Sequence, residues 1–195
     1  NWPGPPAFDK DMWPTVLLLD LLTDGQEAPL NKAVVEDAKL AGEVSPLIDD
    51  GQIAGFAGLI VTGFDGIDLD AVQAAIDTGL AAFKQNGVEP DALARVKAVA
   101  ESRFLAGLGT VNGKGAALAR YDGLLGRSDF ADEDLARLRA VTAEDVMRVF
   151  ATYIDGKPHV AASFVPKGQA ALALEGSTVA RVVEEPIVQG AEAPI

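Results

Sequence analysis

The chain has 195 residues, of which 49% are hydrophobic and 23% are charged, and it contains no cysteine and a single histidine. A chain of this size forms one domain or two small ones around a real hydrophobic core. The lack of cysteine excludes disulfides, thiolate metal sites and a cysteine nucleophile. A zinc site built from several histidines is excluded as well, because His159 is the only one.

The formal net charge is −13, and the acidic residues are concentrated early: residues 1–94 carry 4 Lys and Arg against 16 Asp and Glu. Binding to nucleic acid or to an anionic membrane surface needs clustered basic side chains, so neither partner is expected. No apolar run approaches the roughly 20 residues that span a bilayer. The acidic residues are expected to form a solvated face, with a docking face for a basic partner as the alternative.

Two helices are predicted first. Asp9 or Asp11 is placed to cap a helix over residues 16–22, which are apolar almost all round and therefore buried on most sides. Pro29 then begins a short second helix that ends at Asp37.

A hairpin follows these helices. The apolar runs 40–48 and 53–64 are joined by Asp49-Asp50-Gly51-Gln52, in which Asp-Gly marks the turn. The second run is apolar on both alternating faces, so we expect an interior strand that is covered on both sides.

The rest of the chain is mainly helical. Helices are predicted from Asp68 or Asp70 to Asn86 and from Pro90 onward, because apolar residues recur there at helical spacing. Glycines interrupt the pattern, and it resumes over residues 116–125 and 132–138. A cap at Thr142, with Asp145 in the third position, leads a helix to Tyr153.

A last strand is predicted over residues 160–165, stopped by Pro166. Strands grouped apart from helices favour an α+β fold with a largely antiparallel sheet that carries helices on it. We expect residues 1–166 to form this domain and residues 167–195 an extended linker to a following unit.

Three features could carry chemistry, and each has a simpler interpretation. The segment Gly107–Gly115 fails as a phosphate loop, because Leu108 and Gly115 stand where a glycine and a hydroxyl are needed, and it is interpreted as an inter-helix loop. His159 is expected to be a surface residue. The carboxylate pairs Asp49-Asp50 and Glu184-Glu185 fall in a turn and in the linker, whereas acid–base catalysis needs rigid placement.

Four motifs follow one another along the chain: a leucine-rich helix and glycine turn at residues 21–25, a helix and strand start at 29–41, a helix start at Asn86–Leu93, and a Val-Thr-x-x-Asp-Val segment at 141–146. This ordered set resembles the pitrilysin/insulinase-type zinc peptidases and the mitochondrial processing peptidases. The resemblance covers residues 1–166 and implies an α+β unit, several of which enclose a peptide chamber.

The resemblance also implies where chemistry would lie. The family's catalytic unit carries an H-x-x-E-H zinc motif, which this sequence lacks, so the chain resembles a companion domain and zinc is expected in a separate catalytic domain. In the substrate-binding companion, an Arg and a Tyr seven residues later act near the scissile carbonyl. The matching positions here are Val35 and Gly42, neither of which has a side chain that donates a hydrogen bond.

We therefore expect this chain to contain no catalytic, substrate-binding or metal-binding residues, and to be inactive alone. The resemblance implies a non-catalytic structural or chamber domain of a multi-unit zinc metalloendopeptidase. Its partners would be other peptidase-like domains and the parent's peptide substrate. The alternative is a scaffold or assembly subunit of the same fold with no role in proteolysis. The family's bacterial relatives and the lack of cysteine favour a periplasmic or envelope location.

Overall fold

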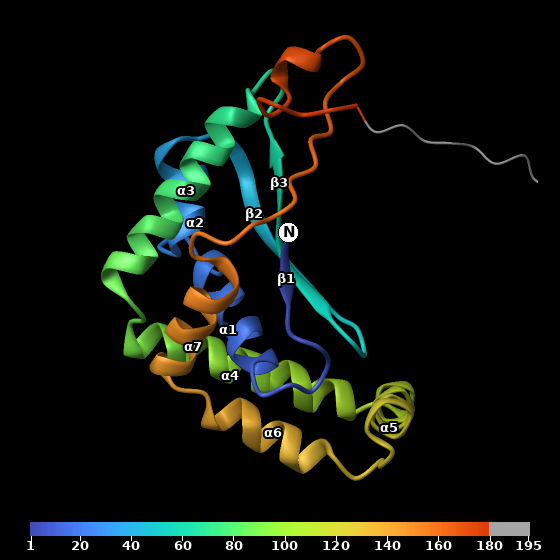
Figure 1. Ribbon diagram of the computed structural model, residues 1–195. Helices are drawn as coiled ribbons and strands as arrows, with labels where there is room; N and C mark the ends of the chain where they lie inside the picture. The colour runs from blue at the N-terminus through green and yellow to red at the C-terminus, as the bar shows by residue number, and fades with distance from the viewer. Residues whose placement is uncertain (180–195) are drawn as a thin grey trace, which may run out of the picture.

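The computed structural model describes residues 1–179 (Figure 1). Seven α-helices, together with shorter helical segments, and a three-stranded antiparallel sheet make up this part of the chain, which confirms the predicted α+β fold. Within it, no helix is long and apolar enough to cross a membrane.

The sheet consists of β1 (Trp2–Gly4), β2 (Ala41–Asp50) and β3 (Gly55–Gly63) in the order β1-β3-β2. The predicted hairpin is confirmed: β2 and β3 pair antiparallel from Asp50 opposite Gly55 up to Ala41 opposite Gly63. β1, which was not predicted, pairs with the start of β3, with Trp2 opposite Ala57. The prediction that β3 is an interior strand is therefore also confirmed.

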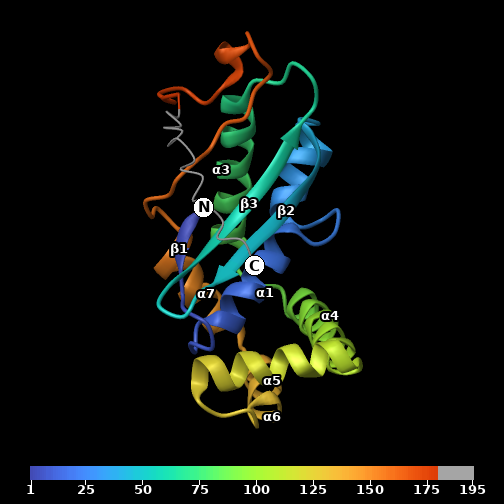
Figure 2. The same cartoon turned by 90° about the vertical axis from the view of Figure 1, so that its right-hand side faces the viewer.

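Helices cover only one face of the sheet, so the prediction that β3 is covered on both sides is wrong. Ala57, Leu59 and Val61 point toward the core. Ile60, on the other face, is 50% exposed, and Figure 2 shows β2 and β3 lying in front of the helices with none before them. Both faces of β3 carry similar apolar residues, so the sequence does not show which face is buried. The helices, which pack on one face alone, decide it.

The predicted strand at residues 160–165 is not formed. Val160 exchanges two backbone hydrogen bonds with Asn1, each 2.9 Å long, and this is where its pairing with the sheet ends. The following residues form no strand and run beside α3 (Figure 2). An alternating apolar segment forms a strand only if a partner strand lies alongside, and among these residues Val160 alone finds one, in Asn1 just before β1.

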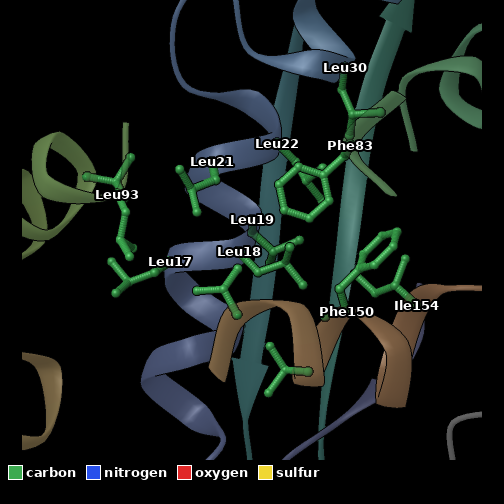
Figure 3. Close-up of a cluster of buried hydrophobic side chains, with 14 of the residues drawn as sticks. Leu17, Leu18, Leu19, Leu21, Leu22, Leu30, Phe83, Leu93, Phe150 and Ile154 are labelled. Carbon is green, nitrogen blue, oxygen red and sulfur yellow. The ribbon is translucent and has the colours of Figure 1, made fainter. Parts of the chain in front are cut away.

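The first helix, α1 (Met12–Thr23), lies at the centre of the molecule. Leu17, Leu18 and Leu19 are three consecutive residues that point in three directions, and all are buried. Figure 3 shows these leucines between side chains of the helices on both sides, among them Phe150 and Leu93. The predicted helix buried on most sides is thus confirmed.

The second helix begins at Pro29 as predicted, but it changes type within one turn. α2 (Pro29–Asn31) continues as a π-helical segment, η1 (Lys32–Asp37). α2 lies close against α3 (Leu69–Asn86): a Cβ on Gly79 of α3 would come within 2.8 Å of both the Leu30 side chain and the Pro29 carbonyl oxygen. Glycine at position 79 therefore permits the close approach of the two helices.

The predicted helices α3 and α4 (Pro90–Leu108) are both present. Asp68 caps α3 by accepting a hydrogen bond from the backbone N–H of Asp70 at 3.0 Å. Phe83 of α3 and Val96 of α4 are buried in the common core, as their helical spacing predicts.

Three further helices complete the lower part of Figure 1: α5 (Val111–Leu125), α6 (Ala131–Ala140) and α7 (Ala143–Val149). A π-helical segment, η2 (Phe150–Ile154), extends α7. The predicted cap is confirmed: the hydroxyl of Thr142 accepts from the Asp145 N–H, and the Asp145 carboxylate accepts from the Thr142 N–H, each at 3.2 Å. An Asp therefore serves where Glu is more usual.

The segment after Pro166 was predicted to be an extended linker. Its first residues instead turn back toward the domain, with a short 3₁₀-helix at Ala170–Leu172. The Glu175 N–H donates to the Asp70 carboxylate at 2.9 Å, which ties the segment to the start of α3. The remainder of the predicted linker, including Glu184 and Glu185, lies outside the described residues, and the domain boundary stays a prediction.

Candidate functional site

The two positions predicted to match the family's substrate-orienting Arg and Tyr lie on neighbouring elements. Val35 lies on η1, half-buried, with its side chain packed against the core. Gly42 lies near the start of β2 and is exposed, beside a shift in the register of β2 against β3. A Cβ there would meet only the Phe64 ring, at an ordinary 4.0 Å. Neither residue presents a polar side chain to a peptide.

His159 lies on the exposed segment just before Val160. Its ring packs against the Trp2 ring with a centroid separation of 5.2 Å. Within residues 1–179, no three His, Asp or Glu side chains gather in a way that could hold a metal ion. His159 is thus a surface residue in contact with an aromatic ring, as the sequence indicated.

The glycine-rich segment is a tight connection between two helices. α4 ends at Leu108, and α5 begins at Val111 with Thr110 as its cap. A Cβ on Gly113 would come within 1.8 Å of the Gly107 carbonyl oxygen, so the turn requires glycine there. The segment does join two helices, as predicted, but the predicted loop is too long: only Gly109 and Thr110 lie between the helices, and residues 111–115, expected before the helix resumes at Ala116, already belong to α5.

The Asp49-Asp50 pair occupies the end of β2 beside the hairpin turn, and the Asp50 carboxylate pairs with Arg120 of α5. One carboxylate of the pair is therefore already neutralised by a guanidinium. The other candidate pair, Glu184-Glu185, lies outside the described residues.

Two carboxylates that the sequence did not indicate as buried groups are buried and fully partnered. The first belongs to Asp11, at the start of α1. It accepts hydrogen bonds from Arg148 Nη1 at 2.7 Å and from the Tyr153 hydroxyl at 3.0 Å. Asp9 or Asp11 was predicted to cap this helix; the Asp11 side chain makes no capping bond, whereas the Asp9 carboxylate accepts from the Asp11 N–H at 2.8 Å. The Asp11 carboxylate instead fastens α1 to α7 and η2.

The second buried carboxylate is that of Asp134 on α6. Its Oδ1 accepts from Trp13 Nε1 at 2.6 Å and its Oδ2 accepts from the Tyr121 hydroxyl at 2.9 Å. Trp13 lies on α1 and Tyr121 on α5, so this single carboxylate joins three helices. Both carboxylates hold the fold together through the partners they already have.

These two networks lead to a prediction about the chain's two tyrosines. Burial and the hydrogen bond to Asp11 raise the pKa of Tyr153 to about 12, and burial and the bond to Asp134 raise the pKa of Tyr121 further. The folded state thus keeps protons that the unfolded state releases near pH 10. The stability that the two raised pKa values contribute is fully present below pH 10, and it is lost as the pH rises through the pKa values of the tyrosines in the folded state.

We expect the ultraviolet absorbance of tyrosinate to appear well above pH 10 in the native protein and near pH 10 in denaturant. Because the chain contains only two tyrosines, the Tyr153→Phe and Tyr121→Phe variants each assign half of the signal. A native protein in which half of the absorbance appeared near pH 10 would contradict the burial of that tyrosine.

A cavity of about 720 Å³ lies between the loop after α1 and the turn that joins α3 to α4. Leu21, Phe83 and Val88 supply apolar lining, while Asp24 and Arg95 lie at its rim and pair with each other. The cavity offers an apolar surface, but no nucleophile and base lie together there. No local pattern predicted it, because its walls come from segments about 60 residues apart in sequence.

Comparison with known proteins gives a consistent result. A family model for the peptidase M16 inactive domain matches residues 1–99, just over half of the chain. The search of curated proteins gives no significant match.

Among solved structures, an inactive peptidase domain from Bordetella parapertussis is similar with a TM-score of 0.70 at 20% identity, over 78% of this chain and 80% of that one. A protease from Helicobacter pylori is similar with a TM-score of 0.68 at 20% identity, over 78% of this chain but only 36% of the protease. A chain of complex III2 from Candida albicans is similar with a TM-score of 0.66 at 13% identity, over 78% of this chain and 38% of that one.

At these identities the structural likeness establishes the fold, and the family match establishes the relationship. The resemblance to the pitrilysin-type zinc peptidases is confirmed, together with the identification of a non-catalytic domain. The chain belongs to the peptidase M16 inactive domain family.

Proposed function

We propose that this chain is the non-catalytic companion domain of a zinc metalloendopeptidase and forms part of the wall of its peptide chamber. The Bordetella parapertussis relative is described as the inactive domain of a zinc protease candidate, and this chain covers 80% of it. The chain covers only 36% of the Helicobacter pylori protease, which leaves room in that protein for further domains.

The observation that carries this proposal is the set of donors available to a metal. The sequence has one histidine and no H-x-x-E-H motif, and His159 packs on Trp2 at the surface. A zinc peptidase needs three protein ligands and a general base around one ion. The residues present do not fit a zinc site, so hydrolysis would have to take place on another unit of the parent protein.

Val35 and Gly42 support a structural role rather than one in substrate orientation. A side chain that stabilises a developing oxyanion must donate a hydrogen bond, and neither residue has a side-chain donor. The domain would then contribute its surface and its position in the assembly.

A scaffold role without proteolysis is the second candidate. It is favoured by the similarity to a chain of complex III2 from Candida albicans, at a TM-score of 0.66 and over 38% of that chain. The two proposals differ in one respect: a companion domain works beside a zinc-binding domain, whereas a scaffold needs no such domain in its assembly.

The test is an assay of the full-length parent protein with three changes made separately: Val35→Ala, Gly42→Ala and deletion of residues 1–166. We expect near-normal peptidase turnover in both point variants, because neither side chain reaches a substrate as a donor. We expect loss of activity in the deletion, because small errors in the position of a distant site cost large factors in rate.

Gly42→Ala is a clean variant, since the added methyl group meets only an ordinary contact and Gly42 does not have a positive φ. Full activity in the deletion would exclude the companion role. A parent that binds no stoichiometric zinc and cleaves no peptide would favour the scaffold role. A selective loss of turnover from Val35→Ala in a normally folded protein would show that position 35 acts on the substrate.

A further inference from the structure

Helix α5 carries an apolar stripe that the fold itself does not bury. Of its side chains only Tyr121 is buried. On the outer side, Val111, Leu118 and Leu125 recur every seven residues and are 90%, 50% and 38% exposed. Seven residues are close to two helical turns, so these side chains lie on one face of the helix, with Gly115 between the first two. We call these four residues the outer stripe. In Figure 1, α5 forms the lower right end of the molecule, and no other helix or strand of the described part lies beyond it.

The glycine in the outer stripe is not required by the contacts of the described residues. A Cβ on Gly115 would meet no atom within 4 Å, and Gly115 does not have a positive φ. Gly113 of the same helix is different, because a Cβ there would collide with the Gly107 carbonyl oxygen. Glycine in the middle of a helix lowers its stability relative to alanine. A glycine on an apolar outer face does, however, permit the backbone of a second helix to approach closely.

Two charged side chains beside the outer stripe make it complementary to itself. Lys114 lies four residues before Leu118, and Asp122 lies four residues after it. Within residues 1–179 neither of them takes part in an ion pair, whereas the neighbouring Arg120 is paired with Asp50. When two copies of a helix pack antiparallel about a twofold axis, residues equally far from the axis in opposite directions face each other. With the axis at Leu118, Lys114 of each copy therefore faces Asp122 of the other.

The net charge of −13 does not oppose contact at this end of the molecule. Residues 95–148, which run from α4 to α7, carry 9 Lys and Arg against 8 Asp and Glu, whereas residues 1–94 carry 4 against 16. The charged residues of α5 itself are Lys114, Arg120 and Asp122. Two α5 helices therefore meet without a large excess of like charge between them.

We propose that the outer stripe is a self-association surface, at which two copies of this chain pair their α5 helices antiparallel about a twofold axis at Leu118. Leu118 then meets its own counterpart, Val111 meets Leu125, and Lys114 pairs with Asp122 on both sides of the axis. Gly115 leaves room for the close contact of the two helices. This inference is independent of the proposed function.

The dimer is expected to be reversible. α5 has 15 residues, and a single pair of helices of this length buries less than the roughly 1,200 Å² of a stable specific interface. The test is sedimentation equilibrium of the 195-residue chain at concentrations from about 5 µM to about 1 mM, because association of this kind depends on concentration. We expect monomers at the lowest concentration and dimers at the highest.

The apolar contact is tested with Leu118→Glu and with a matched pair of glycine variants. Leu118→Glu places two like charges on the axis, and we expect the dissociation constant of the dimer to rise by about tenfold or more. Gly115→Leu should have an effect of the same size, because it fills the space for the second helix. Gly123→Leu is its control: a Cβ on Gly123 also meets no atom within 4 Å, but Gly123 lies off the outer stripe, so dimerisation should be unchanged. Circular dichroism checks that each variant keeps its helices.

The antiparallel register is tested by exchanging the two charges. Lys114→Glu alone sets two negative charges against each other at both ends of the contact, and Asp122→Lys alone sets two positive charges there. We expect each single variant to raise the dissociation constant by about tenfold. The double variant restores opposite charges in the same places, and its dissociation constant should return close to that of the unchanged chain.

A chain that stays monomeric at every concentration would overturn the proposal. So would a dimer that Leu118→Glu does not weaken, or one that Gly123→Leu weakens as much as Gly115→Leu. A double charge variant that associates no better than the two single variants would contradict the antiparallel pairing about Leu118.

Discussion

Replacing Leu18 with alanine is expected to lower the free energy of unfolding by about 2–5 kcal/mol, through the lost transfer of a buried side chain and the cavity it leaves. Leu18 is 0% exposed and lies on the central helix α1. That helix contacts the sheet through β2 and the helical layer through α4 and α7. Because the surrounding elements hold one another in place, the site has little freedom to collapse around a smaller residue.

The measurement is equilibrium unfolding in urea, followed by the fluorescence of the two tryptophans. Leu118→Ala is the matched control: it is the same change on a helix, but Leu118 is 50% exposed, and a cost within about 0.5 kcal/mol is expected there. Losses below about 1 kcal/mol in both Leu18→Ala and Leu21→Ala would contradict the assignment of α1 as a buried helix.

The sequence predicted the elements whose signals are local. The leucine run of α1, the Asp-Gly turn of the hairpin and the Thr142 cap each depend on residues within a few positions of one another, and the structure contains all three. The spacing of apolar residues likewise predicted the buried faces of α3 and α4. Such patterns reflect the 3.6-residue and two-residue periods of the backbone itself.

Features that depend on distant partners were missed or misjudged. β1 has only three residues, including Pro3 and Gly4, and its partner in β3 lies more than 50 positions away. Residues 160–165 have the composition of a strand, but only Val160 among them pairs with a neighbouring backbone, that of Asn1. Strand composition shows that a segment could join a sheet, whereas the presence of a neighbour decides whether it does.

The candidate site shows the same division. His159 was interpreted correctly from its own neighbourhood, and the glycine-rich segment was correctly placed between two helices although its loop was predicted too long. Asp11 was predicted only as a possible helix cap, and Asp134 looks like an ordinary surface acid in the sequence. Their partners lie as far as 142 positions away, and a charge in the sequence carries no sign of its burial. The assignments of Val35 and Gly42 rest on the family resemblance and stay predictions until the parent protein is assayed.

Replacing Asp134 with alanine is expected to cost about 1–3 kcal/mol in stability, because Trp13 Nε1 and the Tyr121 hydroxyl would each lose an acceptor in a place that water reaches poorly. The loss should be concentrated at α5. Of the side chains of this helix, all of which the structure describes, Tyr121 alone is buried. Its ring also packs on Phe8 and Phe130, at centroid separations of 5.3 and 5.5 Å.

Asp132→Ala is the matched control for Asp134→Ala, since Asp132 is an exposed acid in the first turn of the same helix. We expect it to leave stability almost unchanged, and Asp134→Asn to fall between the two, because an amide keeps one acceptor oxygen but loses the other. Hydrogen exchange should show faster opening of α5 in Asp134→Ala while the amides of α1 and β3 stay protected. Equal costs for Asp134→Ala and Asp132→Ala, with α5 exchange unaltered, would show that the aromatic packing of Phe8, Tyr121 and Phe130 holds α5 in place without the carboxylate.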